Sequence, residues 1–256
     1  MDKFSQSLRH WRGLRRYSQL ALASEAGVSA RHLSFLESER ARPSRDMVIS
    51  LCDALSIPNA DRNRMLEAAG FAAIYPVSAL NSAEIAPARE GLVRVLERHD
   101  PFPGILLDRE WRLLRFNAMA KRLFSLSGLS EGDSTLRLLE TPGLMASMIE
   151  NWPEVGHHML LRLKAESRAA GGISSLDHAI RLLERDPDVQ RYTPKGPVSP
   201  VLPTIYRVGD VRLSLFSTYL QIGGAEDLSL TDLKVELMMP ADEASRNWLE
   251  AAASSA

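Results

Sequence analysis

The cationic side chains of this chain are concentrated near its front, and the chemistry open to them is the binding of anions. Residues 1–45 hold nine Lys or Arg against four Asp or Glu, a net charge of +5, although the whole chain has a formal net charge of −1. A basic front on a near-neutral chain indicates an anionic partner that binds there. This charge favours nucleic acid as the partner and predicts an affinity that falls with salt.

The histidines and carboxylates of the later sequence offer no catalytic or metal-binding set. His157 and His158 are adjacent, so on a helix they diverge by about 100° and cannot share a metal as residues four apart could. Glu154 and His157 have a Glu-x-x-His spacing, but a di-iron bundle needs that spacing twice and two further carboxylates. The block Gly132-Asp133-Ser134-Thr135-Leu136 resembles the nucleophile segment of one esterase family, which needs a late histidine as base, and no histidine follows His178.

Common enzyme fingerprints are also missing from the sequence. It contains no P-loop, no Gly-x-Ser-x-Gly elbow and no dinucleotide-binding fingerprint behind an expected strand. We therefore predict that the protein is not an enzyme and needs neither a metal nor a cofactor.

Composition limits the class of protein. The chain has 256 residues and is 45% hydrophobic, 25% charged and 6% aromatic, which is typical of a globular protein and excludes collagen-like repeats and extended disorder. Its single cysteine, Cys52, excludes an internal disulfide and a multi-cysteine zinc or iron–sulfur site. Because the front shows no signal peptide, we expect a cytoplasmic location. No apolar run approaches the roughly 18 residues that a membrane helix needs.

Residues 1–75 have the spacing of five short amphipathic helices, which predicts a compact all-α domain. Ser18, Ser29 and Ser44 are suited to be N-caps, and Gly27 is suited to a left-handed turn. Val28 lies where it can pack on Leu33 as a hydrophobic staple. The expected helices cover residues 4–14, 18–26, 29–37, 44–55 and 59–69.

The later sequence predicts an α+β domain with an antiparallel sheet over residues 89–250, joined to the first domain by a linker at 76–88 and followed by a disordered tail at 251–256. Strands are expected at 104–107, 111–116, 204–208, 211–222 and 234–239. Helices are expected at 117–126, 136–139, 144–170 with a break at Trp152 and Pro153, 174–185 and 240–249. Four prolines, at 194, 197, 200 and 203, predict an irregular crossing that is not a central strand.

A motif in residues 18–37 points to the function of the first domain. It reads Ser18-Gln19-x-x-Leu22-Ala23-x-x-x-Gly27-Val28-Ser29-x-x-x-Leu33-Ser34-x-Leu36-Glu37. Two helices joined through Gly27-Val28-Ser29 must cross at a steep angle, so the second helix projects the face at its N-terminus away from the domain. A face of this kind fits the major groove of DNA.

The motif resembles the helix-turn-helix of phage-repressor or XRE-type regulators, in order and spacing, across residues 4–58. The resemblance implies that the helix opened by Ser29 is the recognition helix, with Arg31 as the best candidate for direct readout, because a guanidinium bridges O6 and N7 of guanine. Ala30 and Phe35 could contact thymine methyls. The residues expected near base edges are Ala30, Arg31, His32, Ser34 and Phe35.

The same resemblance assigns the contacts with the DNA backbone. Gln19 resembles the family's phosphate-contacting glutamine, and three arginines lie in the loop where further phosphate contacts are expected. Arg12 and Glu37 match a pair that bridges the first and third helices, a structural role. The full predicted DNA-binding set is Gln19, Ser29, Ala30, Arg31, His32, Ser34, Phe35, Arg40, Arg42 and Arg45.

The second domain opens with a strand pair that leads into a capped helix, from Ile105 to Ala120, and this pattern resembles the start of PAS-like sensor domains. Asn151-Trp152-Pro153-Glu154 and the closing segments 227–230 and 237–243 resemble the MmyB-like ligand-binding domain that follows XRE-type helix-turn-helix domains. The two resemblances together cover nearly the whole chain. They imply a PAS-like pocket for a small apolar molecule, with fatty-acid-like ligands as candidates, and regulation of genes that often lie beside the regulator's own.

Large side chains on the concave side of the expected sheet could line such a pocket. Each of them could instead belong to the ordinary core, and Asn117 and Asn151 could instead be helix caps. A bound fatty acid or other small apolar molecule is the one ligand expected. The predicted lining residues are Trp111, Asn117, Met119, Phe124, Trp152, Phe216 and Tyr219.

Together, the two domains predict a sequence-specific transcriptional regulator that binds operator DNA and senses a small ligand. Repressor-type operators are commonly palindromic, so we expect a homodimer. Two other classes stay open: an antitoxin or protein–protein adaptor that uses the helix-turn-helix fold, and an enzyme whose turnover resides in residues 88–250. The first domain could also be a plain helical bundle with a solvated arginine face.

Overall fold

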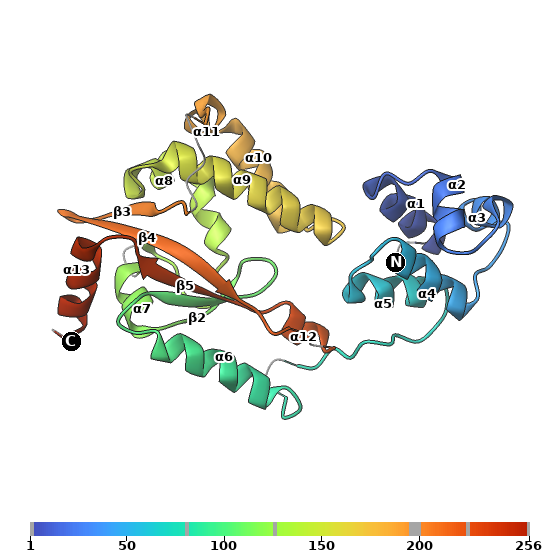
Figure 1. The fold of residues 1–256 in the computed structure, drawn as a ribbon, viewed down its shortest axis with the longest axis horizontal. Helices are drawn as coiled ribbons and strands as arrows, with labels where there is room; N and C mark the ends of the chain where they lie inside the picture. The colour runs from blue at the N-terminus through green and yellow to red at the C-terminus, as the bar shows by residue number, and fades with distance from the viewer. Residues whose placement is uncertain (1–2, 80–81, 125–126, 195–200, 224–225, 255–256) are drawn as a thin grey trace. The chain divides into compact units, whose positions relative to one another are not determined.

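The computed structural model describes residues 3–79, 82–124, 127–194, 201–223 and 226–254 (Figure 1). The chain forms two compact units, one mainly within residues 1–77 and the other mainly within residues 78–256. Within the described ranges, no helix has the length and apolar character needed to cross a bilayer.

Five helices form the described part of the first unit, and each begins close to its predicted start. They are α1 (Phe4–Leu14), α2 (Gln19–Glu25), α3 (Ala30–Glu37), α4 (Arg45–Ala54) and α5 (Asn59–Ala68). The hydroxyl oxygens of Ser18, Ser29 and Ser44 each accept a hydrogen bond, at 3.0 to 3.2 Å, from the backbone N–H three residues later. Each serine thus satisfies a donor that the start of a helix leaves unpaired, which confirms the predicted caps.

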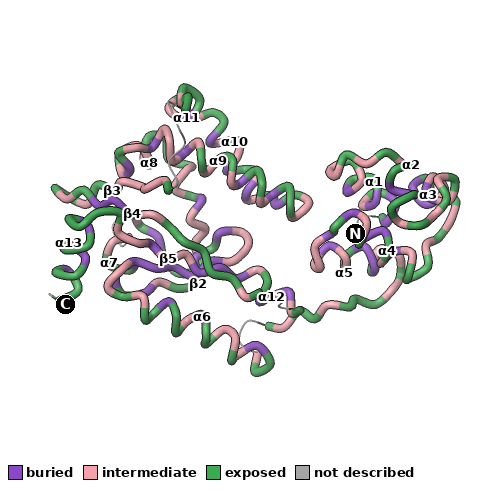
Figure 2. The backbone as a smooth tube through the Cα atoms, viewed as in Figure 1, coloured by how far each residue is buried: buried purple, intermediate pink, exposed green. Residues whose placement is uncertain are grey.

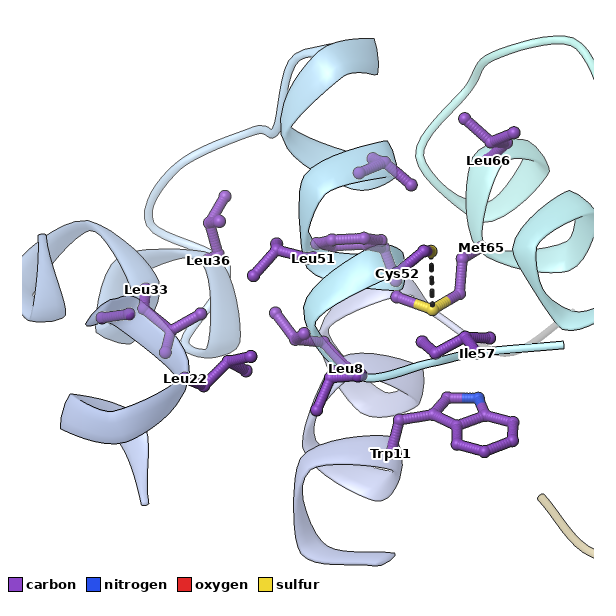
Figure 3. Packing of buried hydrophobic residues seen from close by; sticks show 14 residues of the cluster. Leu8, Trp11, Leu22, Leu33, Leu36, Leu51, Cys52, Ile57, Met65 and Leu66 are labelled. Carbon is purple, nitrogen blue, oxygen red and sulfur yellow. Dashed lines mark hydrogen bonds between the residues drawn. The ribbon is translucent and has the colours of Figure 1, made fainter. Parts of the chain in front are cut away.

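Side chains from all five helices meet in one buried core (Figure 3). Leu8, Leu22, Leu33 and Leu51 are fully buried in it. Cys52 lies in the same core, with its Sγ 3.9 Å from Sδ of Met65. Burial raises the pKa of the Cys52 thiol to about 12, so this cysteine is a packing residue and not a reactive thiol.

The second unit is built on a five-stranded antiparallel sheet with the strand order β2-β1-β5-β4-β3. Its strands are β1 (Gly104–Leu107), β2 (Leu113–Phe116), β3 (Thr204–Val208), β4 (Val211–Leu220) and β5 (Lys234–Pro240). In the register of the sheet, Ile105 pairs with both Phe116 and Glu236, and Glu236 pairs with Tyr219. These four residues therefore form one row across four strands. The sheet confirms the predicted α+β class with an antiparallel sheet.

Helices cover both faces of this sheet. The described helical segments are α6 (Ala86–Arg98), α7 (Ala118–Phe124), the 3-10 helix η2 (Thr135–Glu140), α8 (Leu144–Met148), α9 (Trp152–Ala169), α10 (Ser174–Arg185), α11 (Pro187–Arg191), α12 (Leu228–Thr231) and α13 (Glu243–Ser254). Leu106 packs on Leu96 of α6, whereas Ile105 and Leu107 share the opposite core with residues of α7 and α13. Strand β1 is consequently buried along its whole length. Buried segments also lie in the strands labelled β2 and β5 in Figure 2.

Several element ends differ from the sequence prediction. Helix α6 was not predicted and begins inside the expected linker, because Pro87 lies in its first turn, where the missing N–H costs nothing. Helix α13 continues to Ser254, past the expected end near 249, because Ala252 packs into the core beside Leu249, so the expected tail is helical at 251–254. The expected helix end at 125–126, the prolines at 197 and 200, and the tail at 255–256 lie outside the described residues.

Candidate functional site

The N-terminal half of α3 carries the residues that the sequence analysis expects near the base edges of DNA. Arg31 is exposed at the start of this helix, and its Cζ lies 5.3 Å from the centroid of the Phe35 ring one turn later. Ala30, His32 and Ser34 are partly exposed on the same short helix. The cation–π contact holds a charged side chain beside an apolar one, a pairing able to contact both a guanine edge and a thymine methyl.

Four exposed guanidinium groups lie on α3, in the loop that follows it and at the start of α4. Three other arginines of the first unit form ion pairs: Arg12 with Glu37, Arg62 with Asp53 and Arg64 with Asp61. In contrast, these four form no ion pair with any residue that the structure describes, which leaves their charge to solvent or to an external anion. They are Arg31, Arg40, Arg42 and Arg45.

Gln19 is held in place at the first position of α2. Its Nε2 donates a hydrogen bond to Oε2 of Glu37 at 2.7 Å, and Glu37 is buried. A primary amide has two N–H donors, so this contact occupies one of them and fixes the direction of the other. The arrangement suits a residue that positions a phosphate group, and Ser29 is committed to its cap on α3.

The second unit contains a cavity of about 420 Å³ on the concave face of the sheet. Four of the expected lining residues do line it: Trp111, Phe124, Trp152 and Tyr219. Most other lining side chains are apolar, and they come from the strands, from η2, α8 and α9, and from the segments that connect these elements. Among them are Ile105, Leu113, Phe116, Leu129, Leu138, Met145, Met148, Ile149, Val155, Met159, Leu202 and Met238.

The other three expected lining residues lie outside this lining, each for a local reason. Asn117 is buried and accepts hydrogen bonds from the N–H groups of Gly104 and Ala120, both at 2.9 Å, so it ties β1 to the start of α7. Met119 is buried in the core that α7 forms with the sheet. Phe216 is out of phase with Ser217 and Tyr219, which line the cavity, because successive residues of a strand face opposite sides.

Trp111 reaches the cavity from an unusual backbone conformation. Its φ is +61°, a region that bulky residues rarely occupy. The turn that imposes it is fixed by Asp108, whose Oδ1 accepts hydrogen bonds from the N–H groups of Glu110 and Arg112 at 2.8 and 2.9 Å. The carbonyl oxygen of Trp111 also accepts the N–H of Thr135 at 2.9 Å. The fold thus maintains a strained tryptophan whose ring lines the cavity.

The cavity lining also includes charged groups. Arg162 and Glu236 line it, and Cζ of Arg162 lies 3.7 Å from the Tyr219 ring centroid and 4.8 Å from the Trp111 ring centroid. Burial raises the pKa of the Tyr219 hydroxyl, and the nearby Glu236 carboxylate raises it further. Sequence patterns did not indicate Arg162, because its aromatic neighbours are distant in the chain.

The segments considered for catalysis have structural roles where they are described. The hydroxyl of Ser134 accepts the N–H of Leu136 at 3.3 Å and caps η2. The rings of His157 and His158 are 6.2 Å apart and nearly perpendicular. Across the described ranges, no group of three or more His, Cys, Asp or Glu has the geometry to hold a metal ion.

Comparison with known proteins gives two family matches. The family described as MmyB-like transcription regulator ligand binding domain matches residues 88–252, and a helix-turn-helix domain family matches residues 3–65. No curated protein matches the chain. Among solved structures, an RNA-binding light-oxygen-voltage receptor is 12% identical with a TM-score of 0.28, and the alignment covers 98% of this chain but 63% of that receptor chain.

The first of these matches spans more than half of the chain, and the second covers the helices that carry the recognition motif. A DNA-binding domain thus precedes a ligand-binding domain. The chain belongs to the family of MmyB-like transcription regulators, with a helix-turn-helix domain in front of the MmyB-like ligand-binding domain.

Proposed function

We propose that this protein is a homodimeric, sequence-specific transcriptional regulator whose cavity binds a small, predominantly apolar ligand. The observation that carries the DNA part is the set of four exposed guanidinium groups without described ion-pair partners, on α3 and on the segment that follows it. Cations without ion-pair partners on the recognition helix and on the segment that follows it match the phosphate and base contacts that a duplex requires.

Arg31 is the proposed reader of sequence. It lies in the first turn of the recognition helix, and in helix-turn-helix proteins the N-terminal residues of that helix contact base edges. Its contact with Phe35 restricts the rotamers of both side chains before DNA binds, which reduces the entropy lost on binding. Gln19, Arg40, Arg42 and Arg45 are proposed to bind phosphates.

The cavity supports the sensing part of the proposal. Its volume of about 420 Å³ falls within the range of roughly 300 to 1,000 Å³ that is usual for small-molecule sites. The lining is mostly aliphatic, aromatic and methionine side chains, which favours an apolar body such as a hydrocarbon chain. A ligand can change DNA binding only if it binds one arrangement of the protein more tightly than another.

Two experiments on the full chain test this function. Selection of binding sites from a random duplex pool should enrich two half-sites about 10 base pairs apart, because two recognition helices of a dimer meet the groove one helical turn apart. Native mass spectrometry, before and after treatment with organic solvent, should show a dimer that carries an extractable small molecule. Failure to enrich any sequence, together with a tight protein partner, would instead favour the antitoxin or adaptor alternative.

A further inference from the structure

The recognition helix α3 ends in a turn that places a glutamate where glycine is usual. The backbone N–H groups of Glu39 and Arg40 donate to the carbonyl oxygens of Leu36 and Phe35, at 3.3 and 2.8 Å, which is the Schellman arrangement of a helix end. This arrangement needs a left-handed residue, most often glycine, and here that residue is Glu39, with φ of +62°. A glutamate carries backbone strain that glycine would avoid, so its side chain is expected to have a function.

The carboxylate of Glu39 joins this turn to the start of α1. Its Oε2 accepts a hydrogen bond from Nζ of Lys3 at 2.8 Å, and its Oε1 accepts one from Oγ of Ser5 at 2.9 Å. Ser5 is 3% exposed, so this contact anchors the turn to the packed part of the unit. The hydrogen bonds from Lys3 and Ser5 hold the pKa of Glu39 below its ordinary value, so the carboxylate is ionised at neutral pH. We refer to Glu39, Lys3 and Ser5 as the carboxylate clamp.

The carboxylate clamp lies directly before two arginines that are proposed to bind phosphates. Arg40 is the residue after Glu39, and Arg42 belongs to the same loop between α3 and α4. Both are exposed, and neither forms an ion pair within the described ranges. Binding to DNA removes conformational entropy from such a loop, and a loop that is already fixed in the free protein loses less.

The charge of Glu39 by itself would act against DNA binding. It is a carboxylate next to cations that are proposed to face phosphates, so it should repel the duplex. The ion pair between Lys3 and Glu39 is exposed, and such pairs add little to folding stability. A strained glutamate at this site is therefore unfavourable for charge and nearly neutral for stability, which leaves positioning of the loop as its function.

We propose that Glu39 is a positioning residue for DNA binding. Through Lys3 and Ser5 it fastens the loop after α3 to α1, so that Arg40 and Arg42 are held for their phosphates before a duplex binds. This inference rests on the proposed function, because it concerns the DNA contacts of the same unit.

Three variants of the full chain test the carboxylate clamp by titration with the selected operator duplex. Glu39→Gly removes both the carboxylate and the backbone strain, Glu39→Gln removes the charge but keeps one acceptor oxygen, and Ser5→Ala removes one hydrogen bond without a change of charge. The affinity should fall by roughly threefold to tenfold in Glu39→Gly, and by less in the other two variants. If only the charge of Glu39 mattered, both Glu39 variants would instead bind DNA more tightly than wild type.

Salt dependence and hydrogen exchange separate positioning from a lost contact. The variants keep the same arginine–phosphate contacts, so their plots of log affinity against log salt should lie below the wild-type plot with an unchanged slope, whereas a lost phosphate contact would reduce the slope by about 1. In the free protein, the backbone amide hydrogens of Arg40 and Ala41 should exchange faster in Glu39→Gly and Ser5→Ala than in wild type, because the turn opens more often.

Two control variants match the change in backbone and the change in charge. Ser56→Gly relieves a left-handed position, with φ of +47°, at the end of a different helix, α4, and should leave the affinity for DNA unchanged. Glu25→Gln removes an exposed carboxylate at the end of α2 and should leave the affinity unchanged or slightly raised. Thermal unfolding verifies that each variant is folded, and Glu39→Gly should unfold at or above the wild-type temperature because glycine relieves the strain.

The outcomes separate this inference from the proposed function. Equal or tighter DNA binding by Glu39→Gly, a weakening that is matched by Ser56→Gly, or a salt slope that falls by about 1 would overturn the positioning role while leaving DNA binding itself intact. If Ser5→Ala does not fold, the two Glu39 variants still decide. Failure of the wild type to select any duplex would overturn both proposals.

Discussion

Arg12 holds the buried carboxylate of Glu37 with two hydrogen bonds, from Nε to Oε1 at 2.6 Å and from Nη2 to Oε2 at 3.0 Å. This bidentate pair joins α1 to the end of the recognition helix α3. The same carboxylate accepts Nε2 of Gln19 at 2.7 Å, so one buried group fixes three helices relative to one another. The predicted bridge between the first and third helices is thus present. The same carboxylate also orients Gln19, which is proposed to bind a phosphate of DNA.

The first prediction concerns acid stability. Burial raises the pKa of Glu37, but hydrogen bonds from Arg12 and Gln19 outweigh this effect, and the net pKa lies below its ordinary value. A carboxyl whose pKa is depressed by folding adds stability that is fully present above the unfolded pKa, about 4.3, and is lost as pH falls through the lower folded value.

Urea unfolding of the full chain at different pH values tests this prediction. Arg12→Met should lower the unfolding free energy near pH 7 by about 3 kcal/mol, since the partner carboxylate is left buried and uncompensated. The difference between wild type and variant should shrink below pH 4. A difference that does not change with pH would exclude the charge of Glu37 as its cause.

The second prediction isolates backbone conformation in the turn between α2 and α3. Gly27 has φ of +69°, and no heavy atom lies within 4 Å of the position that a Cβ would take. Gly27→Ala should therefore destabilise by about 1 to 2 kcal/mol through left-handed strain alone. Gly13→Ala is the matched control, because Gly13 lies within helix α1 with equally open surroundings, and it should stabilise by about 0.5 to 1 kcal/mol. Effects of the same sign in denaturant melts would contradict this account.

The first unit was predictable because its signals are local. Each of the serine caps bonds a backbone N–H three residues away, and Gly27 imposes its turn within the same few residues. Pairing of β1 with β5 joins residues more than a hundred positions apart, so its register is not encoded in any local pattern. The lining of the cavity is hard to predict for the same reason, because Arg162 contacts Trp111 and Tyr219 only when the sheet has brought these distant residues together.

Other differences between the sequence prediction and the structure could have been predicted from the residues themselves. The alternation of β4 separates Phe216 from Tyr219, because positions an odd number of residues apart point to opposite faces. Pro87 indicated a linker, although proline is equally suited to the first turn of a helix. Composition indicates a break at such residues, but only burial of Leu92 and Leu96 makes the helix that follows stable.

The third prediction tests whether Asn117 is structural. Its Nδ2 donates to the carbonyl oxygen of Phe102 at 2.8 Å, while its Oδ1 accepts the N–H groups of Gly104 and Ala120. Asn117→Asp keeps the acceptor but loses the donor, and it places a carboxylate against a buried carbonyl oxygen. We expect a loss of roughly 2 to 3 kcal/mol in unfolding free energy at pH 7. A smaller loss at pH 4, where the acid is partly protonated, would support this cause, and a stability equal to wild type would refute it.

The fourth prediction concerns the reader of sequence. Arg31→Ala should cost about 1 to 3 kcal/mol of specific binding at one base position and relax the preference there, while weak non-specific binding persists. Competition gel shifts with operators substituted one position at a time measure this. Arg16→Ala removes an exposed arginine outside the predicted set and is the control. Unchanged operator preference in Arg31→Ala would remove Arg31 as a reader.

The fifth prediction distinguishes phosphate contacts from readout. Arg40 and Arg42 are exposed after α3 and have no ion-pair partner among the residues that the structure describes, so each can neutralise one phosphate. Replacing either by Gln should weaken specific and non-specific duplexes about equally and should reduce the slope of log affinity against log salt by about 1 per protomer bound. Salt titrations on one specific and one scrambled duplex measure both quantities. A slope that stays at the wild-type value would show that these side chains do not release counterions, and an effect confined to the specific duplex would assign them to base readout instead.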